Sequence, residues 1–465
     1  MKKTLLLFYL FLLTAGCYSH PWKPNHFVII DTDGGIDDMR AITMLLASPD
    51  VRVLGIVVSP GALNVDSAFS KVRSLLYSFH HEGIPVSVNK ICTFKSPDFE
   101  VALKTQWGKS VFIKGTIEEA PEMILDILEN EKNPISFLCF GGMSTAAMMS
   151  KEPAFIAGVK EIIRSGEAVK GFNYQIDERS AVQVSSGKIP VKIINGSVKY
   201  FYNDVFLQKI NQTHGEYSDC IIKSFTSELI KNHPYSFTAT DEMIPVFLHF
   251  PELFRLNGNT FQQIDNTDGI RDSTIKILAG ETVQKNQVIR YFPDDPDFYY
   301  DDIRVNVSEI INKYGKEEWV SGVIANELHR HLGTYAIIGV KMGIRAREYF
   351  NTGVDEFSAV SFAGSTPPLS CMNDGLQVST GATPGHGLLT VRNENPSPSV
   401  EFTYMNHKIR LTLKPDLSAK INNELKEINF IYGLDSNIYW ELVRKNTVKY
   451  WLELDRHEIF NIEVL

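Results

Sequence analysis

Apolar and polar positions change their spacing in a regular succession along the first two thirds of the chain. Phe27–Ile30 and Val51–Val58 are short apolar runs typical of buried strands, and Asp38–Ala47 between them has apolar residues at helical spacing. The succession continues with helical stretches at 66–80 and 120–130 and further strand-like runs at 135–140 and 191–194. Strands that alternate with helices indicate an α/β fold, with a mainly parallel sheet flanked by helices.

The pattern changes after about residue 320. A helical stretch near Tyr335–Phe350 is followed by a Gly/Ser/Thr/Pro-rich segment, Ala363–Gly387. Apolar and polar residues then alternate in Lys408–Leu413, and a helix is expected around Asn437–Lys449. We therefore predict two folded units, an α/β domain over residues 26–320 and a C-terminal α+β domain over residues 325–465.

Composition narrows the class of protein. The 465 residues are 44% apolar and 22% charged, which is typical of a globular chain. The formal charge is −9, so a nucleic-acid-binding surface is disfavoured and no nucleic-acid partner is expected. Five cysteines without a C-x-x-C pair do not predict a disulfide scaffold.

The first residues have the pattern of an export signal. Two lysines after Met1 precede an almost wholly apolar stretch, Leu5–Leu13, and Thr14-Ala15-Gly16 then leads to Cys17. Small residues before a cysteine are similar to a bacterial lipoprotein cleavage box, so lipidation of Cys17 is predicted, with ordinary signal-peptide cleavage as the alternative. Residues 1–17 would then be the signal, residues 18–25 a tether, and the protein exported and lipid-anchored in the cell envelope.

Four carboxylates are concentrated at the end of the first strand. Asp31, Asp33, Asp37 and Asp38 lie within eight residues, interrupted by Gly34-Gly35. Crowded carboxylates repel one another unless a cation neutralises them, and hard oxygen ligands suit Ca²⁺ or Mg²⁺. The alternative is an acidic turn that favours the positive end of the following helix.

This motif, Val28–Asp38, resembles the opening motif of the inosine/uridine-preferring nucleoside hydrolases. Further similarities to that family follow in the same order along the chain, in Phe140–Thr145, Gly171–Asp177, Thr240–Asp241 and Phe250–Phe254. The resemblance covers about residues 26–320. It implies the nucleoside-hydrolase fold and cleavage of an N-glycosidic bond.

The resemblance also implies a role for each matching residue. Asp33, Asp38, Asp241 and the backbone carbonyl of Ser144 would hold one Ca²⁺, and Asp33 would take a proton from the attacking water. Asp37 and Asn173 would bind the ribose hydroxyls, and Asp31 would support the ligands from behind. A cation that acidifies water beside a carboxylate base is coherent chemistry for such a hydrolysis.

Three positions depart from the family pattern. Thr240 stands in place of a general-acid histidine, and its hydroxyl cannot donate a proton near neutral pH as an imidazolium can. Gly171 replaces a glutamate that contacts the sugar. Asn64 is displaced within Gly61-Ala62-Leu63-Asn64 and would bind substrate only in a re-shaped loop. His233, eight positions before Asp241, is a candidate substitute for the missing acid, with a surface or core-edge histidine as the alternative.

The C-terminal unit has its own potential ligands. His329 and His331 would point the same way in an extended segment and diverge in a helix. Cys371 and Asp374 precede a glycine-rich stretch, which alternatively is a buried cysteine with a turn-rich loop. Together, about residues 325–460 resemble the FmdE family of formylmethanofuran dehydrogenase components. The resemblance implies a metal such as Zn²⁺ on His329, His331 and Cys371, with Asp374 a further candidate, and a homo-oligomer.

The sequence therefore supports three hypotheses. The first is metal-dependent hydrolysis of a nucleoside or related N-ribosyl compound to base and ribose, in a protein with an appended metal-binding domain. The second is a catalytically degenerate lipoprotein that binds a sugar or nucleoside and a metal, since Thr240 and Gly171 remove two contacts. The third is that residues 325–465 are the enzyme and the first unit is a partner surface.

Overall fold

A computed structural model describes residues 24–90, 98–109, 117–167, 169–196, 198–226, 228–233, 237–264, 266–282, 288–289 and 291–465. The predicted signal and Cys17 lie outside these residues. Among the described helices, none combines the length and the apolar character needed to cross a bilayer.

An eight-stranded sheet organises the first unit, in the order β3-β2-β1-β4-β5-β6-β8-β7. Its strands pair in parallel, except that β7 runs antiparallel to β8. The strands are β1 (His26–Thr32), β2 (Val51–Val58), β3 (Val86–Val88), β4 (Ile135–Cys139), β5 (Val159–Ser165), β6 (Val191–Asn195), β7 (Phe254–Asn257) and β8 (Thr260–Gln263). The prediction of a mainly parallel α/β sheet is confirmed.

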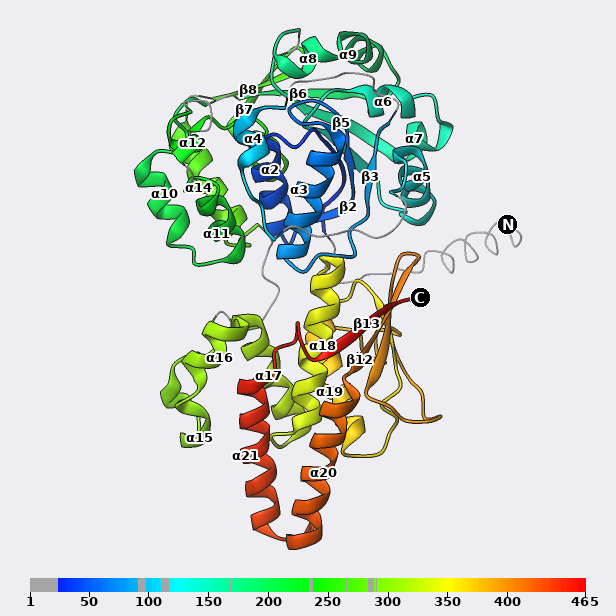
Figure 1. Cartoon of the computed structure of the whole chain (residues 1–465), viewed down its shortest axis with the longest axis vertical. Helices are drawn as coiled ribbons and strands as arrows, with labels where there is room; N and C mark the ends of the chain where they lie inside the picture. Colours follow the sequence, from blue (N-terminus) through cyan, green and yellow to red (C-terminus); the bar gives the residue numbers. More distant parts are fainter. Residues whose placement is uncertain are drawn as a thin grey trace, which may run out of the picture.

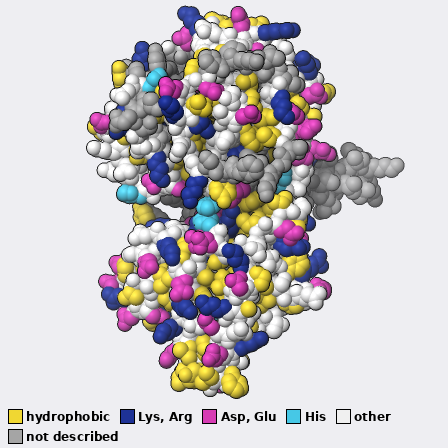
Figure 2. Space-filling view, viewed as in Figure 1, with side chains coloured by type: hydrophobic (Ala, Val, Ile, Leu, Met, Phe, Trp, Pro, Cys, Tyr) yellow, Lys and Arg dark blue, Asp and Glu magenta, His cyan; other side chains and the backbone are white. Residues whose placement is uncertain are grey.

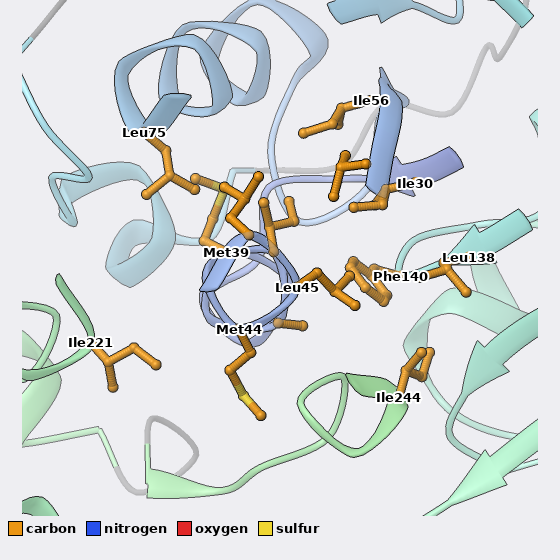
Figure 3. Close-up of a cluster of buried hydrophobic side chains, with 14 of the residues drawn as sticks. Ile30, Met39, Met44, Leu45, Ile56, Leu75, Leu138, Phe140, Ile221 and Ile244 are labelled. Carbon is orange, nitrogen blue, oxygen red and sulfur yellow. The ribbon is translucent and has the colours of Figure 1, made fainter. Parts of the chain in front are cut away.

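Helices cover both faces of this sheet (Figure 1). They are α2 (Ile36–Ala47), α3 (Val65–Ser78), α4 (Glu100–Lys104), α5 (Ala120–Asn130), α6 (Ser144–Met149), α7 (Pro153–Gly158), α8 (Phe172–Ile176), α9 (Glu178–Ser185), α10 (Asp204–Asn211), α11 (Glu216–Lys223), α12 (Glu228–Lys231), α13 (Met243–His249) and α14 (Thr267–Leu278), with a 3-10 turn at Pro251–Leu253. Successive residues of β1 enter different cores. Val28 and Ile30 pack with α2 and α3, whereas Phe27 and Ile29 pack with α5 and α7. Figure 3 shows part of the first core, where Met39 and Leu45 of α2 gather beside Ile30.

The second unit combines a five-stranded sheet with long helices. The strand order is β10-β9-β11-β12-β13, and β9 and β10 pair in parallel while the other described pairs are antiparallel. The strands are β9 (Ser358–Ser361), β10 (Leu389–Val391), β11 (Ser399–Tyr404), β12 (His407–Leu413) and β13 (Phe460–Val464). The helices are α15 (Asp301–Arg304), α16 (Val307–Tyr314), α17 (Lys316–His329), α18 (Thr334–Phe350), α19 (Met372–Thr380), α20 (Pro415–Tyr432) and α21 (Asn437–Glu453), with 3-10 turns at Pro296–Phe298 and Leu369–Cys371. The predicted C-terminal α+β domain is confirmed.

The helices α15 and α16 pack in the second unit, although they precede the predicted boundary near residue 320. Val307 and Tyr314 share a buried cluster with Trp319 and Trp451. At the far end of this unit, Figure 2 shows hydrophobic side chains gathered where α20 turns into α21 in Figure 1. Phe430 and Leu434 are among the exposed apolar residues of that turn.

The two units meet at the amino-terminal ends of the parallel strands. Arg52, the second residue of β2, forms an ion pair with Glu356. The segment between α3 and β3 contacts α18, where Arg345 donates to both carboxylate oxygens of Glu82 at 2.9 and 3.0 Å. His81 Nδ1 lies 2.7 Å from the carbonyl oxygen of Glu348. Ion pairs and hydrogen bonds therefore connect the two units at this interface.

Candidate active site

The acidic motif lies where the strand order reverses. β1 has β2 on one side and β4 on the other, and the chain leaves β1 at Thr32. Such a switch point, at the carboxyl ends of parallel strands, is where open α/β sheets bind ligands. The turn into α2 requires Gly34, whose φ is +80° and whose missing Cβ would lie 2.9 Å from the Cβ of Ala68.

Three carboxylates converge at this turn. Oxygen atoms of Asp37, Asp38 and Asp241 lie within 4.8 Å of one another. Asp38 Oδ2 accepts the Thr32 hydroxyl at 2.6 Å and the Asp33 backbone N–H at 3.1 Å. Asp241 comes from the segment before α13, and its carboxylate accepts a hydrogen bond from the Ser165 hydroxyl at the end of β5. The fold thus joins the predicted motif to an aspartate about 200 residues away.

Burial makes these carboxylates costly to ionise without a cation. Burial, with the Asp38 charge nearby, raises the pKa of Asp33 well above its ordinary value and that of Asp37 to about 6. Burial, with Asp37 and Asp38, also raises the pKa of Asp241. Asp31 is fully buried behind them, and burial raises its pKa to about 7 although Ser59 donates to it at 2.7 Å. A bound dication would reverse this penalty, so this set of hard oxygen donors fits Ca²⁺.

Asp33 lies on the wall of the cluster, in a space that two glycines leave open. A Cβ on Gly61 would lie 2.1 Å from Asp33 Oδ2, and one on Gly141 would lie 3.1 Å from the Cβ of Asp33. Asp33 Oδ1 accepts the Gly35 backbone N–H at 3.3 Å. The side chain is 2% exposed. The missing side chains of Gly61 and Gly141 therefore leave the space that Asp33 occupies.

A cavity of about 750 Å³ opens over the cluster. Among the predicted residues, Asp33, Asp37, Asp38, Asn173, Thr240 and Asp241 line it, as does His233. The rings of Phe99 and Phe172 lie 5.0 Å apart at the cavity and are 45% and 38% exposed. The cavity therefore has an acidic floor and an aromatic edge.

Two of the three positions that depart from the family pattern, Thr240 and Gly171, lie on this wall. The backbone N–H of Thr240 donates to Glu242 at 2.9 Å, which fixes the main chain beside Asp241. Gly171 has a φ of +96°, and a Cβ added there would meet nothing within 4 Å. Asn173 donates from its side chain to the carbonyl of Phe140 at 2.5 Å. The missing glutamate side chain thus corresponds to open space.

Two predicted residues lie outside the described lining of the cavity. Asn64 caps α3, accepting the Ser67 N–H at 2.9 Å and donating to Asp98 at 2.7 Å. Ser144 begins α6, and its hydroxyl accepts from Asn89 at 3.1 Å. A substrate contact from Asn64 and a metal contact from the carbonyl of Ser144 stay predictions.

Several residues that line the cavity were not predicted from the sequence. Arg164 and Lys170 add positive charge to the lining, and Tyr174 adds a third aromatic ring. Arg164 lies at the end of the apolar strand β5, and a charged residue at the carboxyl end of a buried strand is a usable signal for a site. Buried Arg40 also lines the cavity and lies 3.9 Å from Glu242, whose pKa burial raises to about 8.

Two candidate ligands of the second unit, His331 and Asp374, lie beside His329. His329 ends α17, and its ring centroid lies 4.2 Å from that of His331. His329 Nδ1 lies 2.7 Å from Asp374 Oδ2, while its Nε2 is buried with no hydrogen-bond partner among the described residues. A histidine held by a carboxylate on one nitrogen presents the other to a metal. Asp374 is thus placed to orient His329, and the donor set fits a transition metal.

Cys371 lies just before α19, in the 3-10 turn Leu369–Cys371. Burial raises the pKa of its thiol to about 11, and the nearby Asp374 adds to that effect. A thiol must lose its proton to bind a metal, so the site would favour a metal that stabilises a thiolate. Cys371 as a ligand stays a prediction.

Two family models match the chain. Residues 28–288 match the family described as "Inosine-uridine preferring nucleoside hydrolase". Residues 328–449 match "FmdE, Molybdenum formylmethanofuran dehydrogenase operon". The two matches are consecutive and correspond to the two units of the structure.

Similar proteins are found among curated sequences and solved structures. "Probable uridine nucleosidase 1" of Oryza sativa subsp. japonica is 22% identical over 289 residues, which cover 58% of this chain and 88% of that protein. "Probable uridine nucleosidase 2" of the same plant is 25% identical over 301 residues, covering 60% and 87%. The solved "Purine-Preferring Ribonucleoside Hydrolase from Gardnerella vaginalis" is 15% identical with a TM-score of 0.45, covering 55% of this chain and 98% of its own.

Proposed function

Because the chain belongs to the inosine-uridine preferring nucleoside hydrolase family through residues 28–288, we propose that it hydrolyses the N-glycosidic bond of a nucleoside or a related N-ribosyl compound in a Ca²⁺-dependent reaction. The products would be the free base and the sugar. The observation that carries this proposal is the cluster of buried carboxylates at the floor of an open cavity.

The residues of the cavity suit the separate tasks of this reaction. Asp38 and Asp241 would hold the cation together with a further carboxylate, Asp37 or Asp33. When bound, Ca²⁺ supplies positive charge that orients a water molecule and lowers its pKa. Asp33 accepts the proton of that water, so the nucleophile forms next to the sugar. Carboxylate charge near the anomeric carbon stabilises the oxocarbenium-like transition state.

Substrate recognition would come from the polar floor and the aromatic edge. Asp37 and Asn173 line the cavity, where Asp37 would accept hydrogen bonds from ribose hydroxyls and Asn173 would donate to them. Phe99 and Phe172 offer π-faces on which a nucleobase stacks. This division of the cavity agrees with a ligand that has one polar and one planar half.

The test is hydrolysis of a panel of purine and pyrimidine nucleosides by the full chain, with Ca²⁺ and after chelation. Calcium-dependent release of base, lost in Asp33→Asn, is expected. Calcium binding measured by calorimetry, without turnover of any nucleoside, would falsify the hydrolase proposal.

A binding function is the second candidate, because Thr240 and Gly171 leave the leaving-group and sugar sides without their family partners. In that case ribose or a nucleoside would bind only when Ca²⁺ is present, and no base would be released. Calorimetry on the Ca²⁺-loaded protein distinguishes the two functions.

For the second unit we propose a transition-metal site, with Zn²⁺ the first candidate, on His329, His331 and Cys371. The unpartnered Nε2 of His329 supports it. Metal analysis of the full chain should show loss of a transition metal in His329→Gln. Equal metal content in the variant and the wild type would remove the assignment. Equal rates of base release by His329→Gln and the wild type would contradict the third hypothesis, in which the second unit is the enzyme.

Export and lipidation of Cys17 are a further proposal, with ordinary cleavage as the alternative. Fatty-acid labelling of the expressed protein should be lost in Cys17→Ser, and the variant should leave the membrane fraction. Absence of label from the wild type would contradict lipidation. We also propose that the protein forms a homo-oligomer, which a measurement of its mass in solution would test.

A further inference from the structure

A second cluster of metal-ligating side chains lies in the first unit, away from the acidic cavity. Ligand atoms of His26, Asp50 and His249 lie within 4.8 Å of one another. His26 begins β1, Asp50 lies in the turn before β2, and His249 ends α13. The cluster thus lies at the amino-terminal edge of the parallel sheet, opposite the edge that carries the acidic motif.

The separations in this cluster are those of groups that share an ion. His26 Nε2 lies 3.9 Å from Asp50 Oδ2, and His249 Nδ1 lies 3.8 Å from the same oxygen. Both gaps are too long for a hydrogen bond. Two ligands of a tetrahedral zinc, each about 2.1 Å from the ion, are about 3.4 Å apart. Shifts of a few tenths of an ångström, about the size of ordinary side-chain motion, would close the site.

Hydrogen bonds hold one of the two histidines in an orientation suited to a metal. The Ser48 hydroxyl lies 3.0 Å from His249 Nε2 and 2.9 Å from the Thr282 hydroxyl. This chain of hydrogen bonds fixes the ring with Nδ1 facing Asp50, as the outer partners of metal-binding histidines do.

Asp50 has capacity left for a cation. Asn25 donates to Asp50 Oδ1 from its backbone at 2.9 Å and from its side chain at 2.9 Å, and its side chain also lies 3.0 Å from Oδ2. Each carboxylate oxygen has about two acceptor sites, so Oδ2 keeps one. The side chain of Asp50 is 6% exposed. Between two imidazoles, this buried carboxylate is the third ligand that a cation would need.

We propose that His26, Asp50 and His249 form a second metal site of the first unit, for a borderline divalent cation such as Zn²⁺, with water as the fourth ligand. A donor set of two imidazoles and one carboxylate binds Zn²⁺ in preference to Ca²⁺. The bound ion would join the start of β1 to the end of α13. Asp241 lies just before the other end of this short helix, so the ion would steady the element that follows the acidic cluster.

The test uses the full chain, stripped with a chelator and then saturated with Ca²⁺ to occupy the acidic cluster. Zn²⁺ is titrated by calorimetry into the wild type, His26→Gln and His249→Gln, with His407→Gln as the matched control. We expect each cluster variant to bind one equivalent fewer than the wild type and the control. Ser48→Ala should keep the stoichiometry but bind about 10–100-fold more weakly.

Two further measurements keep the outcome decisive. Circular dichroism of the stripped proteins shows whether each variant folds. If His249→Gln does not, His26→Gln decides, because that side chain is 18% exposed and tolerates replacement better. X-ray absorption of the zinc-loaded His329→Gln variant, in which the second-unit site is removed, should report imidazole and carboxylate ligands. Equal zinc stoichiometry in the wild type, His26→Gln and His407→Gln would overturn the assignment.

Discussion

Gly61 is needed for the acidic cluster, because its missing side chain leaves the space that Asp33 occupies. Its missing Cβ would overlap Asp33 Oδ2 at 2.1 Å. Asp33 is 2% exposed. The position of the proposed catalytic carboxylate is thus set partly by a residue with no side chain.

Replacing Gly61 by Ala should therefore displace Asp33. We expect a loss of Ca²⁺ affinity of about 10-fold or more, and a stability cost of about 1–3 kcal/mol from overpacking. Gly142→Ala is the matched control, since its Cβ would lie 3.6 Å from the nearest atom, in ordinary contact. Calorimetry and chemical denaturation measure the two effects. Equal calcium affinity in the two variants would contradict this account of Asp33.

Thr240 tests whether the leaving-group side is incomplete. An imidazole in Thr240→His would supply the acid that a hydroxyl cannot, so turnover of purine nucleosides should rise by at least about 10-fold. The gain should fade as pH rises above about 6.5, because only the protonated ring donates. Thr238→His, at another position on the cavity wall, should show no gain. A pH-independent rate equal to the wild type would show that the cavity activates the base by other means.

The acidic motif could be predicted because its four carboxylates lie within eight residues at the end of a recognisable strand. The sequence did not predict Ser165, Arg164 or Phe99 as parts of the same cavity. These residues belong to separate elements of the chain. They line the same cavity as Asp241 only because of the order of the strands in the sheet. Spatial neighbours without a shared local pattern leave little trace in a single sequence.

The helices α18 and α19 set the geometry of the second unit. Gly339 and Gly375 let their backbones touch, since a Cβ on Gly339 would lie 2.1 Å from the carbonyl oxygen of Met372. A Cβ on Gly375 would lie 2.0 Å from the carbonyl oxygen of Ala336. Asp374, which holds His329, is carried on the helix that this contact positions.

A methyl group at this crossing should therefore push the helices apart. Gly375→Ala is expected to cost about 1–3 kcal/mol of stability and to weaken transition-metal binding as Asp374 shifts. Gly385→Ala is the control, because its nearest neighbour would be the Thr383 hydroxyl at 3.6 Å. Denaturation midpoints and metal titrations provide the comparison. Equal midpoints for the two variants would mean that the crossing can relax.

Long elements with a clear period were predicted well. The helix expected at 120–130 is α5, and that at 437–449 extends to Glu453 as α21. The strand β2 is found as predicted at Val51–Val58. Short strands such as β9 and β10, with four and three residues, were not identified, because a period needs more residues to be detected. The pairing of β9 with β11 is set by the fold.

At the scale of the whole molecule, His81 makes one of the polar contacts between the two units. Its side chain lies between Glu348 and Tyr217, with Nε2 2.8 Å from the tyrosine hydroxyl. Burial lowers the pKa of His81 to about 4, and nearby His80 also lowers it, against Glu348 and Glu82. Both ring nitrogens are thus used by partners from the two units.

Acid should therefore loosen this contact. Above pH 6.5 His81 is neutral in both the folded and the unfolded chain, so its contribution to stability is complete. As pH falls towards 4 only the unfolded chain gains the proton, and about 3 kcal/mol of stability is lost. His81→Gln should flatten the pH dependence of the unfolding free energy over this range, whereas His407→Gln should not. An unchanged slope in His81→Gln would contradict the assignment.

The attachment of the second unit to the amino-terminal edge of the sheet also governs how material moves between the two units. The acidic cavity opens at the carboxyl ends of the strands, near α8, on the side remote from the second unit (Figure 1). We therefore expect a base or sugar released there to enter bulk solvent and to be diluted before it meets His329, without direct channelling to the second unit. An added scavenger of the free product should therefore intercept it, and the two sites would work separately although the units are in contact.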